Sequence, residues 1–203
     1  MRSTTRSSRC RRIGREIGIY SLLLLGMLAA RSTLADHYYV PSGSMQPTLF
    51  PGDRVVVDKR VYGLRVPFTQ VRLADGAAVE RGEVVIFDSP RDGARLIKRI
   101  VATGGDEVSI RNGHLWVNGR PLADARRSDT EVFADRIVRL DLQNGGGPDY
   151  SGVVPDGKLL AVGDHRGNSL DGRMFGLIDE ESVYGRAVAV YFRRDDGFVW
   201  RSL

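Results

Sequence analysis

Short apolar runs bounded by glycine, proline or aspartate recur along most of the chain. Residues 54–59 (RVVVDK), 82–89 (GEVVIFDS) and 95–102 (RLIKRIVA) are rich in β-branched side chains, as β-strands are. The segments KLLAVGD (158–164) and YGRAVAVYF (184–192) have the same character, and helical periodicity is scarce. The pattern predicts an all-β fold of antiparallel sheets.

The middle of the chain has the pattern of small hairpins. Asn-Gly pairs at 112–113 and 118–119 are strong tight-turn signals, and they flank a short predicted strand over 114–117. Residues from about 120 to 157 are more polar and contain the loop NGGGPD (144–149). We therefore expect a core formed by residues 36–104 and 158–203, interrupted by a small hairpin-rich β insertion over 105–157.

The N-terminal region contains an uncharged apolar run, IGIYSLLLLGMLAA, over residues 17–30. Its 14 residues are fewer than the roughly 17–25 that a spanning helix needs. A basic tail (1–16) before it and small residues at 33 and 35 after it fit a removable signal peptide as well as a transmembrane anchor over 17–35. Either way, the arginines predict a cytoplasmic N-terminus and an exported remainder.

Composition excludes several classes of protein. With 42% hydrophobic and 27% charged residues, the 203-residue chain is of ordinary globular type. Six arginines and Glu16 within residues 1–16 account for the whole net charge of +5, so we expect no nucleic-acid partner. Cys10 is the only cysteine, which rules out an intramolecular disulfide. We find no paired Cys/His set and expect neither a metal nor another cofactor.

The segment VPSGSMQPTLFPGD (40–53) is either a flexible tether or the site of a nucleophilic serine, Ser42 or Ser44. A serine hydroxyl needs a base, because it is a poor nucleophile while protonated. His165 lies close in sequence to Asp164, Ser169 and Asp171, which suggests a Ser-His-Asp triad. Against this, GNSLD lacks the last glycine of the G-x-S-x-G motif, and triad members usually come from separate elements.

Lys98 is the other candidate base. Alternation along the strand places it on one face with Leu96 and Ile100, where its charged form is poorly solvated. From an ordinary pKa near 10.4, neutral lysine at pH 7 costs about 4.6 kcal/mol, and burial is able to supply shifts of that size. The alternative is that Lys98 extends to solvent from a strand edge, or pairs with an acid such as Asp88.

Several separated segments together resemble the type I signal peptidases, Ser-Lys membrane proteases that remove signal peptides from exported proteins. PSGSMQPTLFPGD resembles their nucleophile motif, RGEVVIF their next strand, and LIKRIVATGGDEVSI their general-base strand. GDHRGNSLDGRMFGLI and the closing VYGRAVAVYF also fit. The resemblance extends from about Tyr39 to Phe192, in matching order and spacing.

The resemblance implies a role for each matched residue. Ser44 corresponds to the nucleophile and Lys98 to its general base, while Ser42 and the backbone N–H of Ser44 correspond to the oxyanion donors. Ser169 corresponds to a hydroxyl that orients the lysine amine. A polar scaffold behind the site would comprise Arg99, Asp164, Arg166, Asp171 and Arg173. The chain departs from the family at His165, where asparagine is usual, and at Gly167, where aspartate is frequent.

The implied protein is a membrane-bound serine endopeptidase that cleaves N-terminal signal peptides with small residues at positions −1 and −3. Family members keep their N-terminal segment, which favours a single-pass protein of the inner (plasma) membrane, with its catalytic domain on the outer or periplasmic side. One alternative is a specialised processing protease for a pilin or a conjugation protein. Another is a catalytically inactive, membrane-tethered β binding module, against which the intact Ser42, Ser44, Lys98 and Ser169 argue.

Overall fold

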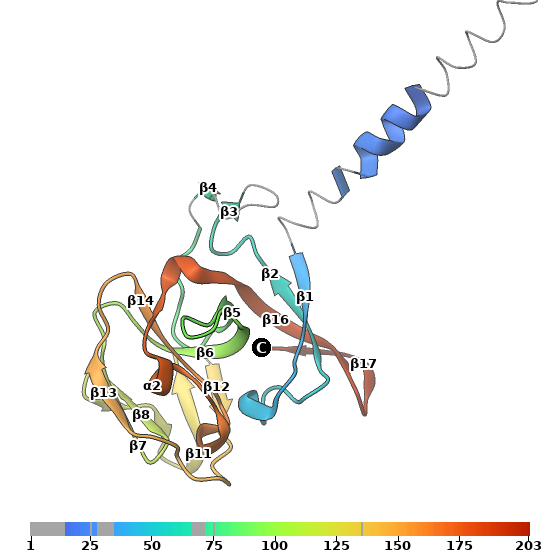
Figure 1. The fold of residues 1–203 in the computed structure, drawn as a ribbon. Coiled ribbons are helices and arrows are strands. Elements are labelled where there is room, and N and C mark those ends of the chain that lie inside the picture. The colour runs from blue at the N-terminus through green and yellow to red at the C-terminus, as the bar shows by residue number, and fades with distance from the viewer. Residues whose placement is uncertain (1–14, 25, 28–34, 66–71, 75, 135) are drawn as a thin grey trace, which may run out of the picture.

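Antiparallel β-strands form most of the regular structure (Figure 1). The structure, a computed structural model, describes residues 15–24, 26–27, 35–65, 72–74, 76–134 and 136–203. Within these residues, helical structure past residue 35 consists of short turns and the four-residue helix α2 (Gly172–Phe175). The prediction of an all-β fold with antiparallel sheets is confirmed.

The largest sheet has eight strands and contains both halves of the predicted core. Its order is β1-β2-β16-β5-β6-β14-β15, with β17 also pairing with β16. The strands are β1 (Ala35–Tyr39), β2 (Arg54–Asp58), β5 (Val84–Asp88), β6 (Arg95–Thr103), β14 (Lys158–Val162), β15 (Ile178–Asp179), β16 (Val183–Arg193) and β17 (Gly197–Ser202).

Smaller sheets lie between β6 and β14 in the sequence. One has the order β13-β7-β8-β9 and the other the order β10-β11-β12, while β3 pairs with β4 as a separate ribbon. These strands are β3 (Leu64–Arg65), β4 (Arg72–Ala74), β7 (Glu107–Arg111), β8 (His114–Val117), β9 (Arg120–Pro121), β10 (Ala123–Asp124), β11 (Arg127–Phe133), β12 (Arg136–Arg139) and β13 (Tyr150–Val153).

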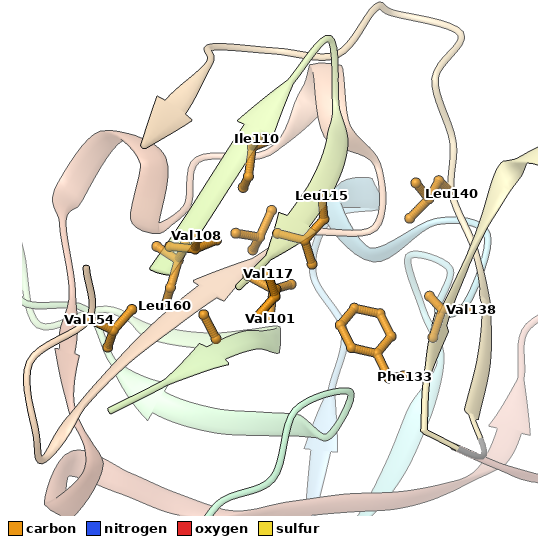
Figure 2. Close-up of a cluster of buried hydrophobic side chains, with 12 residues drawn as sticks. Val101, Val108, Ile110, Leu115, Val117, Phe133, Val138, Leu140, Val154 and Leu160 are labelled. Carbon is orange, nitrogen blue, oxygen red and sulfur yellow. The ribbon is translucent and has the colours of Figure 1, made fainter. Parts of the chain in front are cut away.

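The small sheets pack onto the large one through a shared apolar cluster (Figure 2). Val101 of β6 and Leu160 of β14 contribute to this cluster from the large sheet. Leu115 of β8 and Phe133 of β11 contribute from the small sheets, and all four side chains are buried. The insertion is therefore joined to the core by buried apolar surface as well as by its two chain connections.

The two predicted Asn-Gly turns are confirmed. Asn112 and Gly113 have φ of 49° and 81°, and Asn118 and Gly119 have φ of 52° and 74°. Positive φ at both central residues is the conformation of the type I′ hairpin turn, which asparagine and glycine tolerate best. The first of these turns joins β7 to β8, as expected from the sequence.

The N-terminal segment is described in part. Residues 15–24 and 26–27 are helical, whereas residues 1–14, which include Cys10, and residues 25 and 28–34 lie outside the described residues. The predicted anchor over 17–35 therefore falls partly outside them. Of the helices in the described ranges, none has both the length and the apolar character needed to cross a membrane.

Candidate active site

A single turn of 3-10 helix, η1 (Gly43–Met45), carries Ser44. Gln46 N donates to Gly43 O at 3.0 Å and closes the turn. Met45 and Leu49 on either side of this closure are fully buried in the cluster beneath β2 and β16. Their burial fixes the segment to the sheet, so residues 42–49 are part of the folded core and not a flexible tether.

Ser44 and Lys98 are in direct contact. Lys98 Nζ donates to Ser44 Oγ at 2.5 Å, and the two residues are 54 positions apart in the sequence. Lys98 is only 3% exposed, and Leu96 and Ile100, on the same strand face, belong to one apolar cluster. The alternative that Lys98 extends to solvent or pairs with Asp88 is wrong, because Lys98 is buried and Asp88 pairs with Arg95.

The surroundings of Lys98 favour its neutral form. Burial lowers the pKa of Lys98 to about 8, against the opposing charges of Asp171 and Asp164 and with a smaller contribution from Arg173. At that pKa, neutral lysine at pH 7 costs about 1.4 kcal/mol instead of roughly 4.6 kcal/mol. The chain thus has a buried amine, next to a serine hydroxyl, that loses its proton close to physiological pH.

Two polar groups lie close to the Ser44 hydroxyl. Ser42 Oγ is 3.4 Å from Ser44 Oγ, a long hydrogen bond. The N–H of Ser44 lies in the first turn of η1, where N–H groups have no partner within the helix itself. The predicted role of Ser42 Oγ and Ser44 N–H as oxyanion donors stays a prediction.

The segment between β14 and β15 packs against the back of η1. His165 N donates to Ser44 O at 3.1 Å. A Cβ on Gly163 would lie 2.2 Å from Ser169 Oγ and 2.5 Å from Ser44 O, so only glycine fits there without a shift. Ser169 Oγ is buried near Ser44, and no hydrogen bond of it meets normal geometry among the described residues. Its predicted role in orienting Lys98 stays a prediction.

Two buried ion pairs support this segment. Arg99 Nε and Nη2 donate to Asp164 Oδ1 and Oδ2 at 2.9 and 2.7 Å. Arg173 Nε and Nη2 donate in the same bidentate way to Asp171, both at 2.8 Å. Burial opposes ionisation of Asp171, but the hydrogen bonds and charge of Arg173 outweigh it and lower the pKa of Asp171. Bidentate pairs of this kind fix side-chain orientation.

A third buried ion pair joins the same segment to the insertion. Arg166 Nη2 donates to Glu131 Oε2 at 2.7 Å, and both side chains are completely buried. Arg166 also donates to the carbonyl oxygens of Gly113 and Gly163. The structure therefore brings together, near Ser44 and Lys98, the five predicted scaffold residues Arg99, Asp164, Arg166, Asp171 and Arg173.

Sequence reasoning missed two members of this network. Thr48 Oγ1 donates to Asp164 Oδ2 at 2.5 Å, and Glu131 is the partner of Arg166. Thr48 lies within the nucleophile motif, but nothing local distinguishes its hydroxyl from that of a surface threonine. Glu131 lies in β11, 35 positions before Arg166, and its burial depends on how the insertion packs.

His165 is buried next to the network but does not join a triad. Its Nδ1 is 3.7 Å from Asp141 Oδ2, too far for a hydrogen bond. Neither ring nitrogen has a hydrogen-bond partner among the described residues. The Ser-His-Asp alternative therefore finds no support in the geometry of His165. In the described part of the chain, no group of three His, Cys, Asp or Glu side chains is arranged to hold a metal ion.

Comparison with known proteins shows which family this chain resembles. The family described as "Signal peptidase, peptidase S26" matches residues 11–192. The signal peptidase I of Pseudomonas fluorescens is 30% identical over 195 residues, which cover 83% of this chain and 69% of that protein. A protein of Synechocystis sp. named "Probable signal peptidase I-2" is 32% identical over 182 residues, covering 86% and 70%.

A crystal structure of a signal peptidase I from Enterococcus faecalis V583 matches with a TM-score of 0.42 and 26% identity, covering 54% of this chain and 97% of the other. The family match covers most of this chain, including Ser44, Lys98 and the buried ion pairs near them. This chain belongs to the signal peptidase family, peptidase family S26.

Proposed function

We propose that this chain is a serine endopeptidase that cleaves signal peptides from exported preproteins, with Ser44 as nucleophile and Lys98 as general base. The observation that carries the proposal is the 2.5 Å contact between Lys98 Nζ and Ser44 Oγ, made by a buried lysine whose pKa is lowered to about 8. A base next to the nucleophile with its pKa near the working pH is what serine activation requires.

The proposed reaction proceeds through an acyl-enzyme. Neutral Lys98 takes the proton of Ser44 Oγ as this oxygen attacks the scissile carbonyl, and the resulting oxyanion accepts hydrogen bonds from Ser42 Oγ and Ser44 N–H. The Lys98 ammonium then donates its proton to the leaving amine, and the C–N bond breaks. Water, deprotonated by Lys98, hydrolyses the ester and restores the serine. One oxyanion donor of this kind contributes roughly 3–4 kcal/mol of transition-state stabilisation.

The edge of β1 supports binding of an extended peptide. β1 is the end strand of the large sheet and pairs only with β2 in the described structure. Val40, next to β1, exchanges hydrogen bonds with Asp53 O and Gly52 N on the β2 side, at 2.9 Å each. Backbone groups alternate in direction along a strand, so those of Tyr39 and His37 point away from β2, although His37 N already donates to Asp36 Oδ1 at 2.8 Å.

β6 presents a second free edge. Ile100 N and O bond to Glu83 O and Gly82 N on the β5 side, so the alternation directs the backbone groups of Arg95 and Ile97 away from β5. β14 pairs with β6 from Arg99 to Thr103, and no strand of the described residues pairs with the earlier part of β6 on that side. Tyr38 Oη donates to Arg95 O at 2.9 Å, so the two edges face each other. A substrate strand inserted between β1 and β6 would form backbone hydrogen bonds with both edges.

The proposed substrates are preproteins with small residues at −1 and −3, and the proposed location is the inner membrane. Membership of the signal peptidase family supports the substrate class. The apolar run at 17–30 behind a basic tail supports a single membrane anchor with the N-terminus in the cytoplasm. The dyad would then act on the outer or periplasmic side, where the cut site of an exported protein emerges.

Cleavage of a preprotein carrying an Ala-x-Ala site, assayed with the full chain in detergent or vesicles, tests the proposal. Ser44→Ala and Lys98→Ala are each expected to reduce cleavage to background, because they remove the nucleophile and its base. His165→Ala is the matched control and should keep most of the activity. An active Lys98→Ala together with an inactive His165→Ala would overturn the Ser-Lys assignment.

A further inference from the structure

One backbone carbonyl at the proposed substrate site between β1 and β6 already accepts a hydrogen bond in the free protein. Arg95 O lies on the open edge of β6, and the Tyr38 hydroxyl donates to it at 2.9 Å. Desolvation raises the pKa of Tyr38 above its usual 10.0, although the charge of Arg95 opposes this. The hydroxyl therefore stays protonated, and remains a donor, throughout the neutral pH range.

The neighbours of Arg95 hold this carbonyl in place. The Arg95 guanidinium forms a bidentate ion pair with Asp88, at 2.9 and 3.3 Å, and lies 4.2 Å from the centroid of the Tyr184 ring. Tyr184 Oη donates in turn to Asp36 Oδ2 of β1 at 2.8 Å. Asp36 and Tyr38 of β1 are thus tied to the first residue of β6 by two separate routes.

We propose that the Tyr38 hydroxyl acts as a latch on Arg95 O, which a substrate must displace with its own backbone N–H to pair with Arg95. This inference rests on the proposed function, because it assumes that the substrate binds as a strand between β1 and β6. A side chain that occupies an acceptor on the free edge of a strand competes with any incoming strand for that acceptor.

The position of the latch predicts which part of the substrate meets it. Arg95 is three residues before Lys98, or about 10 Å along the strand. β1 follows an apolar N-terminal run, just as the cut site of a signal peptide follows its apolar segment. A substrate that enters from the same side runs parallel to β1, so the N–H that competes with Tyr38 belongs to a residue between −5 and −3.

The size of the effect follows from the strength of one neutral hydrogen bond. Tyr38→Phe removes the hydroxyl and leaves the ring, so Arg95 O is bonded only to water before substrate binds. The net advantage of a typical intramolecular hydrogen bond over water corresponds to a factor of roughly two to ten. We expect Tyr38→Phe to raise kcat/KM by that factor, mainly through a lower KM.

The test uses the full chain and a set of synthetic signal-peptide substrates, each N-methylated at one residue between −6 and −2. For each peptide, kcat/KM is measured with the unmutated protein and with Tyr38→Phe. The value for Tyr38→Phe is divided by the value for the unmutated protein, and this ratio is compared between peptides. We expect the two- to tenfold gain for the unmodified peptide and for most methylated ones, and a ratio near one for the single peptide that lacks the competing N–H. Tyr150→Phe, which removes a hydroxyl from β13, is the matched control and should give a ratio near one throughout.

Two outcomes overturn the latch. A ratio of one or less for the unmodified peptide would mean that Arg95 O accepts from the Tyr38 hydroxyl and the substrate N–H at the same time, or that the hydroxyl plays no part in binding. The same gain for every methylated peptide would mean that Tyr38→Phe acts through the general structure of β1. Failure of the latch leaves cleavage by Ser44 and Lys98 intact, whereas failure of the proposed function appears as cleavage that survives Lys98→Ala.

Discussion

Replacing Lys98 by methionine should abolish cleavage and, at neutral pH, stabilise the fold. Methionine has a similar length and flexibility and no charge, so it fills the same apolar space without an ammonium to desolvate. Lys98 is 3% exposed, and its pKa is lowered from 10.5 to about 8 in the folded protein. A buried base with a lowered pKa destabilises the native state wherever the unfolded chain would carry the proton.

The magnitude follows from the two pKa values. Between pH 8 and 10.5 the unfolded state binds more protons than the folded state, so the stability of the unmutated protein rises with pH through this window. Linkage gives a cost of about 3.3 kcal/mol at pH 7 and of about 0.8 kcal/mol at pH 10. Lys98→Met removes this dependence, so its stability advantage should shrink by about 2.5 kcal/mol over that range.

Urea unfolding at several pH values from 7 to 10 measures the difference directly. Lys158→Met is the matched control, because Lys158 lies at the surface of the large sheet with its side chain 40% exposed. The difference between the unmutated protein and Lys98→Met should narrow with pH, while that for Lys158→Met should not. If the free energies of unfolding of Lys98→Met and of the unmutated protein differed by the same amount at every pH, the lowered pKa of Lys98 would be refuted. The proposed reason why Lys98 can act as the base would then fail too.

Two further substitutions test the support behind the dyad. Glu131→Gln leaves the Arg166 guanidinium buried without its counter-charge and should lower the free energy of unfolding by about 3–5 kcal/mol in a urea titration. Asp179→Asn, which removes the charge from an exposed ion pair, is the control. Equal losses of stability in the two variants would contradict the role given to burial. Gly163→Ala brings a methyl group within 2.5 Å of Ser44 O and should lower kcat on the order of 10²-fold by displacing Ser44, the proposed nucleophile. The circular dichroism spectrum should remain that of the folded protein. An unchanged kcat would show that the turn accommodates the methyl group without moving Ser44.

The sequence predicts those features that depend on neighbouring residues. Alternation identified β6 and placed Lys98 on the face of Leu96 and Ile100, because side-chain direction in a strand has a period of two. The Asn-Gly pairs identified the turns because few other residues tolerate positive φ. In both cases, the physical cause lies within a few residues of the feature.

The remaining features depend on long-range packing. The pairing of Arg166 with Glu131 requires the insertion to fold back over the loop after β14, and no local pattern in β11 indicates it. The contact of Ser44 with Lys98 joins residues 54 positions apart, and composition and periodicity alone left the surface alternative for Lys98 open. Resemblance to a family supplied the pairing, and the structure shows the Lys98 amine buried in contact with the Ser44 hydroxyl.

The most direct test of the Ser-Lys assignment is the pH dependence of kcat/KM for a signal-peptide substrate. The active form of Lys98 is the neutral amine, so activity should rise tenfold per pH unit below an apparent pKa of about 8 and level off above it. The same limb should persist in His165→Ala. A limb near pH 6.5 that disappears in His165→Ala would identify a histidine as the base and contradict the role of Lys98.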